Sequence, residues 1–146
     1  MRALAEYGID AYGIEASRPM ITIGLTARAK LPPEIRRNIH FCIGDMRSFS
    51  FEIQFPLIII PFHSFWSNMN RAEAEQCVRC ILDVLTPAGV FLVDTPTLND
   101  EFLLGSKYDW WVETAEKFKF SFRMERYTKP DGARLGEILV SQKNSP

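Results

Sequence analysis

The sequence has no long apolar run, no excess of one charge and few cysteines. Its 146 residues carry 17 Lys and Arg against 18 Asp and Glu, a net charge of -1, so no broad basic surface for nucleic acid is expected. No stretch approaches the roughly 18 apolar residues of a membrane span, and the amino-terminal segment has no signal-peptide pattern. We therefore expect a cytoplasmic protein that binds a small molecule, and neither nucleic acid nor a membrane.

The three cysteines, Cys42, Cys77 and Cys80, argue against a disulfide framework, because their number is odd and no secretion signal precedes them. Cys77 and Cys80 form one C-x-x-C pair, but no second pair or histidine cluster follows at zinc spacing. Packing on a helix is favoured over metal or redox use, and no metal site is predicted.

Strands alternate with helices over the first two thirds of the chain, which predicts an α/β fold with a mainly parallel sheet. The expected order is a helix end at 4–7, a strand at 9–15, a helix at 17–30, strands at 38–44 and 55–62, a helix at 70–85 and a strand at 90–94. Residues 55–62 run without a polar interruption, which is typical of a central strand covered on both faces.

The last third has a different pattern. Apolar and polar residues alternate from Lys117 to Met124, which predicts a strand with one buried face and one solvent-exposed face. The turn sequence Pro130-Asp131-Gly132 then lets residues 135–140 return as an antiparallel hairpin. We expect residues 1–100 to form a parallel-sheet core and residues 101–146 to add a helix and this hairpin.

Two further clusters have a structural and a functional interpretation. Tyr108, Trp110 and Trp111 suit packing on the sheet more than contact with a substrate. The basic residues of the hairpin are most simply a solvated face, with binding of an anion as the minority interpretation. They are Arg123, Arg126, Lys129 and Arg134.

Ligands of open parallel sheets bind outside the carboxyl ends of the strands. The residues expected there are Glu15, Asp45, the segment 61–64 and the segment 94–96. An acidic residue after an early strand can accept both hydroxyls of a ribose. By itself Glu15 is equally a solvated strand-end carboxylate. Asp45 has a structural alternative as the aspartate of a Gly-Asp turn, and the adenine role is preferred only in view of the surrounding motifs.

Several motifs carry a resemblance to class I S-adenosylmethionine-dependent methyltransferases, in particular the small-molecule and sugar-amine N-methyltransferases. They lie at residues 4–8, 13–20, 44–47, 55–65 and 85–89. They occur in the same order and spacing as in that family, from about residue 3 to residue 96. The resemblance implies a Rossmann-like methyltransferase sheet, S-adenosylmethionine as cofactor and a small-molecule methyl acceptor.

By position, the resemblance implies that Glu15 accepts the ribose hydroxyls and that Asp45 takes the adenine amino group. The backbone of Met46 would meet the edge of the adenine ring, and the side chains of Ala16 and Met46 would help to wall the adenosine.

Pro61, Phe62 and His63 would line the methyl-transfer end in such a site. His63 is the candidate catalytic residue, because an imidazole that titrates near neutral pH can accept a proton from the acceptor. A histidine at a strand end is, however, more often a hydrogen-bonding residue of the pocket wall, so both roles are kept for His63.

Methyltransferases of this class begin with a strand and a glycine-rich turn that holds the methionine part of the cofactor. We expect the sheet to be truncated at its amino terminus, because Met1 falls inside the helix that follows that turn. The absent strand would expose sheet edges and favour a homo-oligomer. The carboxyl-terminal hairpin is either an acceptor-covering insert or the sheet edge, and its turn looks more like the insert.

Three functions remain: methyl transfer by a fragment or truncated enzyme, an inactive methyltransferase-like module for binding or oligomerisation, and a nucleotide-binding domain of another α/β class. The matches at 44–45 and 61–65 disfavour the third.

Overall fold

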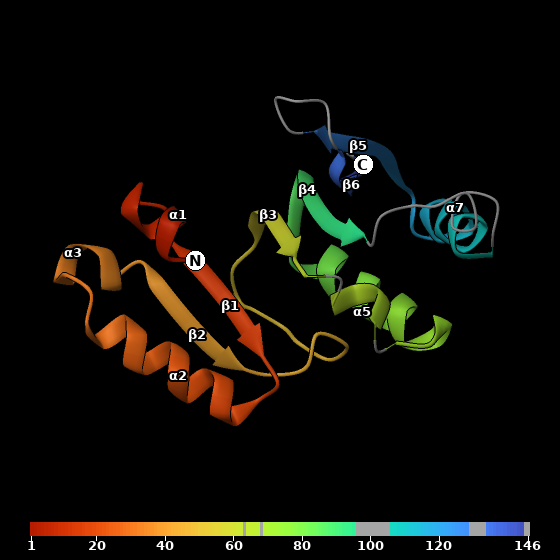
Figure 1. Cartoon of the computed structure of the whole chain (residues 1–146). Helices are drawn as coiled ribbons and strands as arrows, with labels where there is room; N and C mark the ends of the chain where they lie inside the picture. The colour runs from red at the N-terminus through yellow and green to blue at the C-terminus, as the bar shows by residue number, and fades with distance from the viewer. Residues whose placement is uncertain (63, 68, 96–105, 129–133, 145–146) are drawn as a thin grey trace. The chain divides into compact units, whose positions relative to one another are not determined.

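The computed structural model of this chain describes residues 1–62, 64–67, 69–95, 106–128 and 134–144. The chain divides into two compact units, residues 1–49 and residues 50–146, and each is described by itself (Figure 1). The boundary expected near residue 100, on sequence character, stays a prediction. In the described part of the chain, none of the helices has the length and apolarity needed to cross a membrane.

The first unit is a strand–helix–strand arrangement with two short additional helices. Its elements are α1 (Arg2–Glu6), β1 (Ala11–Glu15), α2 (Arg18–Ala29), α3 (Pro33–Arg36) and β2 (Ile39–Ile43). Strands β1 and β2 are parallel, with Ala11 opposite Ile39 and Glu15 opposite Ile43. The two strands therefore end at the same edge of the sheet, as the predicted order requires.

Local signals in the sequence set the ends of these helices. Gly8 has φ +76°, the left-handed conformation that stops α1, and glycine adopts it without steric cost. The Ser17 hydroxyl accepts a hydrogen bond from the backbone N–H of Met20 at 3.4 Å and caps α2, with Pro19 in the first turn. The helix ends at Ala29 with Lys30 as its C-cap, within one residue of the predicted end.

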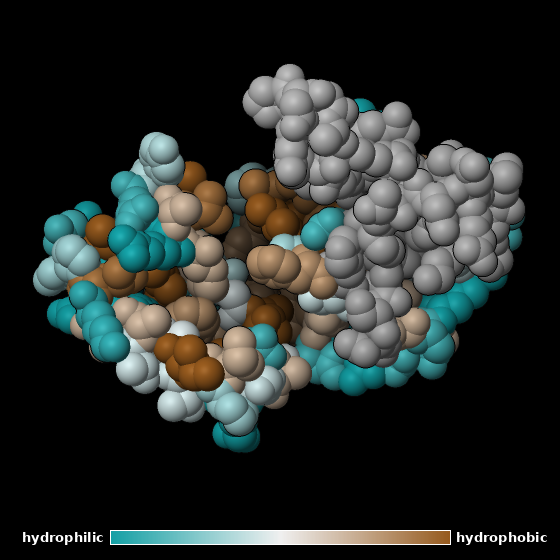
Figure 2. All heavy atoms as spheres, viewed as in Figure 1, coloured by the Kyte–Doolittle hydropathy of each residue, from teal (hydrophilic) through white to brown (hydrophobic). Residues whose placement is uncertain are grey.

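The core of the first unit is small. Ala5, Ala11 and Ile39 are its fully buried apolar residues, and α2 contributes none. Figure 2 shows hydrophobic surface open on the face of this unit that it views. The large apolar residues that are exposed here include Tyr7, Ile9, Met20, Ile23 and Leu25. Part of the apolar surface of this unit is thus uncovered.

The second unit is a mixed four-stranded sheet with helices. Its elements are β3 (Phe55–Ile60), α4 (Ser64–Ser67), α5 (Arg71–Val84), β4 (Leu85–Thr95), α7 (Ser106–Phe118), β5 (Phe120–Thr128) and β6 (Arg134–Lys143). The strand order is β3-β4-β6-β5. Strands β3 and β4 are parallel, whereas β6 is antiparallel to both β4 and β5.

Helix α5 starts with a capping box. The Asn70 side chain accepts from the Glu73 N–H at 3.1 Å, and the Glu73 carboxylate accepts from the Asn70 N–H at 2.9 Å, which satisfies two donors of the first turn. Cys77 and Cys80 lie on the buried stripe of this helix. Their burial supports the packing interpretation of the C-x-x-C pair.

The hairpin belongs to the edge of the sheet. Strand β6 pairs with β4 from Val90–Gln142 to Thr95–Glu137, so β5 and β6 continue the sheet that β3 and β4 begin. This pairing supports the sheet-edge interpretation over the acceptor-covering insert. The sequence pattern alone does not distinguish these two, because a two-residue period is the same in either place.

The predicted start of the hairpin strand at Lys117 is wrong, because α7 continues through Phe118 and β5 begins at Phe120. Lys117 forms an ion pair with Glu75 of α5, and the Arg79 guanidinium of α5 lies 5.5 Å from the centroid of the Phe118 ring. These contacts with α5 stabilise the last turn of α7, and tertiary packing overrides the local alternation.

Trp111 forms the centre of the second core. Its indole meets the rings of Phe65, Phe91 and Phe120 at centroid distances of 5.4, 6.1 and 5.7 Å. Trp110 is also buried and lies 5.6 Å from Trp111. Both tryptophans thus pack in the core, as the prediction of packing on the sheet expected. The Tyr108 side chain lies outside the described part of the structure.

Strand β3 is less covered than its apolar sequence predicts. Ile60 is buried, but Leu57 and Ile59 on the other face are 45% and 46% exposed. The expectation of a strand covered on both faces is therefore wrong for the structure. Trp111 of α7 packs on the Phe91 side of the sheet, and Ile58 is in register with Phe91. The face of Leu57 and Ile59 is opposite.

Candidate functional site

Two carboxylates lie at the carboxyl ends of the paired strands of the first unit. Glu15 is the last residue of β1, and Asp45 follows β2 by two residues. The Gly44 N–H donates to the Glu15 backbone carbonyl at 3.1 Å, so the pairing of the strands extends to the residue before Asp45. Parallel pairing places both acidic residues at one edge of the sheet, where ligands of such sheets bind.

The Glu15 side chain is held by the turn that starts α2. Its Oε1 accepts a hydrogen bond from the Ser17 N–H at 2.8 Å. A carboxylate has about four acceptor positions, so this contact orients the group and leaves capacity for hydroxyl donors. Ala16, between Glu15 and Ser17, is exposed at the same edge.

The Asp45 carboxylate is bound by Arg47, two residues further on. Oδ1 accepts from the Arg47 backbone N–H at 2.8 Å and from Nε at 2.9 Å, while Oδ2 accepts from the second guanidinium nitrogen at 2.6 Å. These hydrogen bonds hold the pKa of the Asp45 carboxyl at about 2, below its ordinary 3.8. The group is therefore ionised at neutral pH, and Met46 is half-buried beside it.

The guanidinium also limits what Asp45 can do. With both oxygens engaged by Arg47, an adenine amino group must share the carboxylate with the guanidinium or displace it. Arg47 had no predicted role, although the Asp-x-Arg spacing is short enough for such a contact. A hydrogen-bonded Asp turn is the signal that would have identified it.

In the second unit, the strand-end residues Pro61 and Phe62 follow β3, and Asp94 lies near the end of β4. The Phe62 N–H donates to Asp94 Oδ2 at 3.1 Å, across the parallel pair of strands. Phe62 has φ 60° and its side chain is 87% exposed. The Ser64 hydroxyl donates to the Pro61 carbonyl at 2.9 Å, which helps to fix the turn.

The predicted site residues fall into two groups. Glu15, Ala16, Asp45 and Met46 lie together at the strand ends of the first unit, and Pro61 and Phe62 lie at the strand ends of the second. His63, the candidate catalytic residue, lies outside the described residues. Asp94 was predicted at a strand end, but its bond to the Phe62 backbone follows only from the pairing of β3 with β4.

Comparison with known proteins gives solved structures of similar fold and no match in sequence. No protein-family model matches the chain, and no curated protein matches it in sequence. The glycopeptide N-methyltransferase MtfA matches with a TM-score of 0.73 and 14% identity, over 99% of this chain and 83% of MtfA.

Two further solved structures agree with this match. The CcbJ methyltransferase from Streptomyces caelestis gives a TM-score of 0.75 and 15% identity, over 98% of this chain and 78% of CcbJ. The amino pentose methyltransferase CalS10 from Micromonospora echinaspora gives 0.68 and 14%, over 91% of this chain and 73% of CalS10. At such low identity the likeness is one of fold, and this chain has the Rossmann-like α/β fold of S-adenosylmethionine-dependent methyltransferases.

Proposed function

We propose that this chain takes part in S-adenosylmethionine-dependent methyl transfer to a small-molecule acceptor. The observation that carries the proposal is the pair of carboxylates, Glu15 and Asp45, at adjoining strand ends of a methyltransferase fold. MtfA, one of the proteins of similar fold, has been crystallised with S-adenosylmethionine and with S-adenosylhomocysteine. Cofactor binding is accordingly the first property to test.

In this proposal the first unit binds the adenosine half of the cofactor. Glu15, held by the Ser17 N–H, accepts the two ribose hydroxyls. Asp45 accepts the adenine amino group once the Arg47 guanidinium shares or leaves its carboxylate. The backbone of Met46 meets the edge of the adenine ring, and Ala16 and Met46 wall the adenosine.

The strand ends of the second unit form the methyl-transfer end in the proposal. Pro61 and Phe62 line it, with the Phe62 ring exposed and its backbone held by Asp94. S-adenosylmethionine, when bound, would supply the methyl group, and Pro61 and Phe62 would help to align the acceptor with it. His63 takes the proton that the acceptor loses, and most of the rate comes from alignment of the reacting atoms.

The acceptor in this proposal is a small molecule and not a nucleic acid, because a net charge of -1 gives little attraction for a phosphate backbone. The cytoplasmic location expected from the sequence is part of the same proposal.

A second candidate function is an inactive methyltransferase-like module for binding or oligomerisation. The observation that favours it is the exposed apolar face of β3, at Leu57 and Ile59. Strand β3 is also an edge strand of the described sheet, and an apolar edge strand is a site where a second chain can add. Such a module would bind adenosine about as tightly as S-adenosylhomocysteine, because only the adenosine half has partners.

The deciding experiment is isothermal titration of the purified chain with S-adenosylhomocysteine and, separately, with adenosine. Wild type is compared with Glu15→Ala and Asp45→Ala, and Glu34→Ala on the exposed helix α3 is the matched control. Loss of hydrogen bonds to a charged group, each about 1.5–3 kcal/mol, predicts affinities about tenfold to a hundredfold lower in the first two variants.

Each outcome separates the candidates. Saturable binding of S-adenosylhomocysteine that is tighter than that of adenosine, and that only Glu34→Ala retains, supports the methyltransferase proposal and justifies a screen of acceptors. Equal binding of the two ligands favours the binding module. A folded chain that binds neither ligand contradicts the adenosine site.

A further inference from the structure

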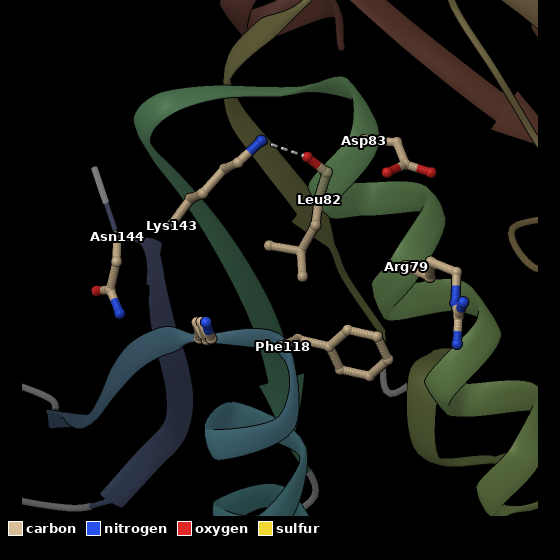
Figure 3. A pocket seen from close by; sticks show the side chains of 7 residues that line it. Arg79, Leu82, Asp83, Phe118, Lys143 and Asn144 are labelled. Atoms are coloured by element: carbon tan, nitrogen blue, oxygen red, sulfur yellow. Dashed lines mark hydrogen bonds between the residues drawn. The ribbon is translucent and has the colours of Figure 1, made fainter. Parts of the chain in front are cut away.

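A pocket lies within the second unit, away from the strand ends that carry Phe62 and Asp94. Its volume is about 330 Å3, within the range of small-molecule sites. The last turns of α5 supply Arg79 and Leu82, and the junction of α7 and β5 supplies Phe118 and Lys119. The end of β6 supplies Lys143 (Figure 3).

The floor of this pocket is apolar. Leu82 and Phe118 supply its hydrocarbon surface, and Figure 3 shows the Phe118 ring lying between Leu82 and Arg79. The Arg79 guanidinium is 5.5 Å from the centroid of that ring. A guanidinium that stacks on an aromatic ring contacts the ring through the flat face of the guanidinium. Its N–H groups therefore remain available to donate hydrogen bonds to a second partner.

The rim is predominantly cationic. Arg79, Lys119 and Lys143 line it against a single carboxylate, that of Asp83. Within the part of the chain that the structure describes, neither Arg79 nor Lys119 forms an ion pair. Nearby Lys117 and Arg71 are different, because both are bound to Glu75.

Lys143 anchors the pocket to α5. Its Nζ donates to the Leu82 carbonyl at 2.7 Å and to the Leu85 carbonyl at 3.2 Å, at the carboxyl end of the helix. A cation at this end offsets the partial negative charge of the helix terminus, which otherwise repels an anion. An ammonium has three donors, so one N–H of Lys143 remains for a ligand.

We propose that this pocket binds a small organic anion, namely a carboxylate or phosphate ester joined to a flat apolar group. The oxyanion is bound by Arg79 and Lys119, and the apolar group lies on Leu82 and Phe118. The Asn144 amide at the rim offers a further polar contact. The site lies at the amino end of β4, near Leu85, whereas the candidate methyl-transfer end lies beyond its carboxyl end at Asp94.

The test is calorimetric titration of the full chain with phenyl phosphate and with benzoate. Inorganic phosphate and the neutral benzyl alcohol are the comparison probes. The proposal expects saturable one-site binding of both aromatic anions, with inorganic phosphate and benzyl alcohol at least about tenfold weaker. Arg79→Gln and Lys119→Gln should each lower the affinity about tenfold or more, from the usual strength of charge-assisted hydrogen bonds.

The matched control is Lys30→Gln, at the exposed carboxyl end of α2 in the other unit, which should bind the aromatic anions as wild type does. Thermal denaturation of each variant shows whether it is folded. Absence of saturable binding by folded wild type overturns the proposal. So does equal loss in the Lys30→Gln control, or binding of benzyl alcohol as tight as that of benzoate.

Discussion

The carboxylate of Asp94 accepts a hydrogen bond from the backbone N–H of Phe62 at 3.1 Å, between the ends of two parallel strands. Phe62 is held there at φ 60°, a conformation that costs a residue with a Cβ atom about 1–2 kcal/mol. Phe62 is 87% exposed, so burial of its ring does not offset this cost. Strained residues of this kind concentrate at functional sites, which is where the proposed function places Phe62.

Phe62→Gly is expected to stabilise the fold and to weaken cofactor binding. Glycine removes the left-handed strain, while its freedom in the unfolded chain costs about 0.4–1 kcal/mol, so a net gain of up to about 1.6 kcal/mol is expected. Loss of an aromatic contact of about 0.5–1.5 kcal/mol should lower the affinity for S-adenosylhomocysteine about two- to tenfold. Urea unfolding and calorimetry measure the two effects.

Phe62→Ala is the control for this substitution, because it removes the ring and keeps the Cβ strain. It should weaken binding as Phe62→Gly does, without the gain in stability. Wild-type affinity in both variants would remove Phe62 from the proposed site.

The ion pair of Asp45 with Arg47 predicts a dependence of stability on acid pH. The folded state holds the pKa of Asp45 at about 2, below its ordinary 3.8, so the unfolded chain binds more protons between these values. The free energy of unfolding should thus fall as the pH drops from about 4 towards 2. The effect is small, because the Asp45 side chain is 36% exposed and solvent screens the pair.

An NMR titration of the Asp45 carboxyl carbon checks this directly. Arg47→Gln should raise the pKa of Asp45 towards 3.8. Arg37→Gln should leave that pKa unchanged, because Arg37 precedes the amino end of β2 whereas Asp45 follows its carboxyl end. If Asp45 titrates near 3.8 in wild type, the two side chains do not form this contact in solution. Arg47→Gln should also tighten S-adenosylhomocysteine binding, because it removes the competitor for the carboxylate.

The exposed face of β3 predicts self-association. Within the described residues β3 pairs with β4 alone, and Leu57 and Ile59 present an apolar face. We expect a dimer or larger species by light scattering, with Ile59→Lys shifting the population towards monomer, because edge charges oppose strand addition. Ile23→Lys, on the exposed surface of α2, is the matched control. A wild-type monomer over the whole concentration range would contradict this prediction.

Much of the first unit was predictable because its signals are local. Gly8 stops α1, Ser17 and Pro19 start α2, and the alternation in residues 38–44 marks β2. The positions of Glu15 and Asp45 at one edge follow from these elements, since consecutive parallel strands around a helix end on the same side. The contact of Arg47 with Asp45 could not be predicted in this way, because it depends on the rotamers of the two side chains.

By itself, then, the sequence determined most of the elements, their order and the strand-end acidic residues, because caps, turns and periodicity act over a few residues. It did not predict the short helices α3 and α4. Only the tertiary structure determined that strand β6 of the hairpin pairs with β4 and that α7 continues through Phe118. It also determined that the side chains of Leu57 and Ile59 are exposed. It also decided that Asp94 holds Phe62. Each of these features depends on contacts between segments far apart in the chain. The free energy of such contacts cannot be predicted from a local sequence pattern.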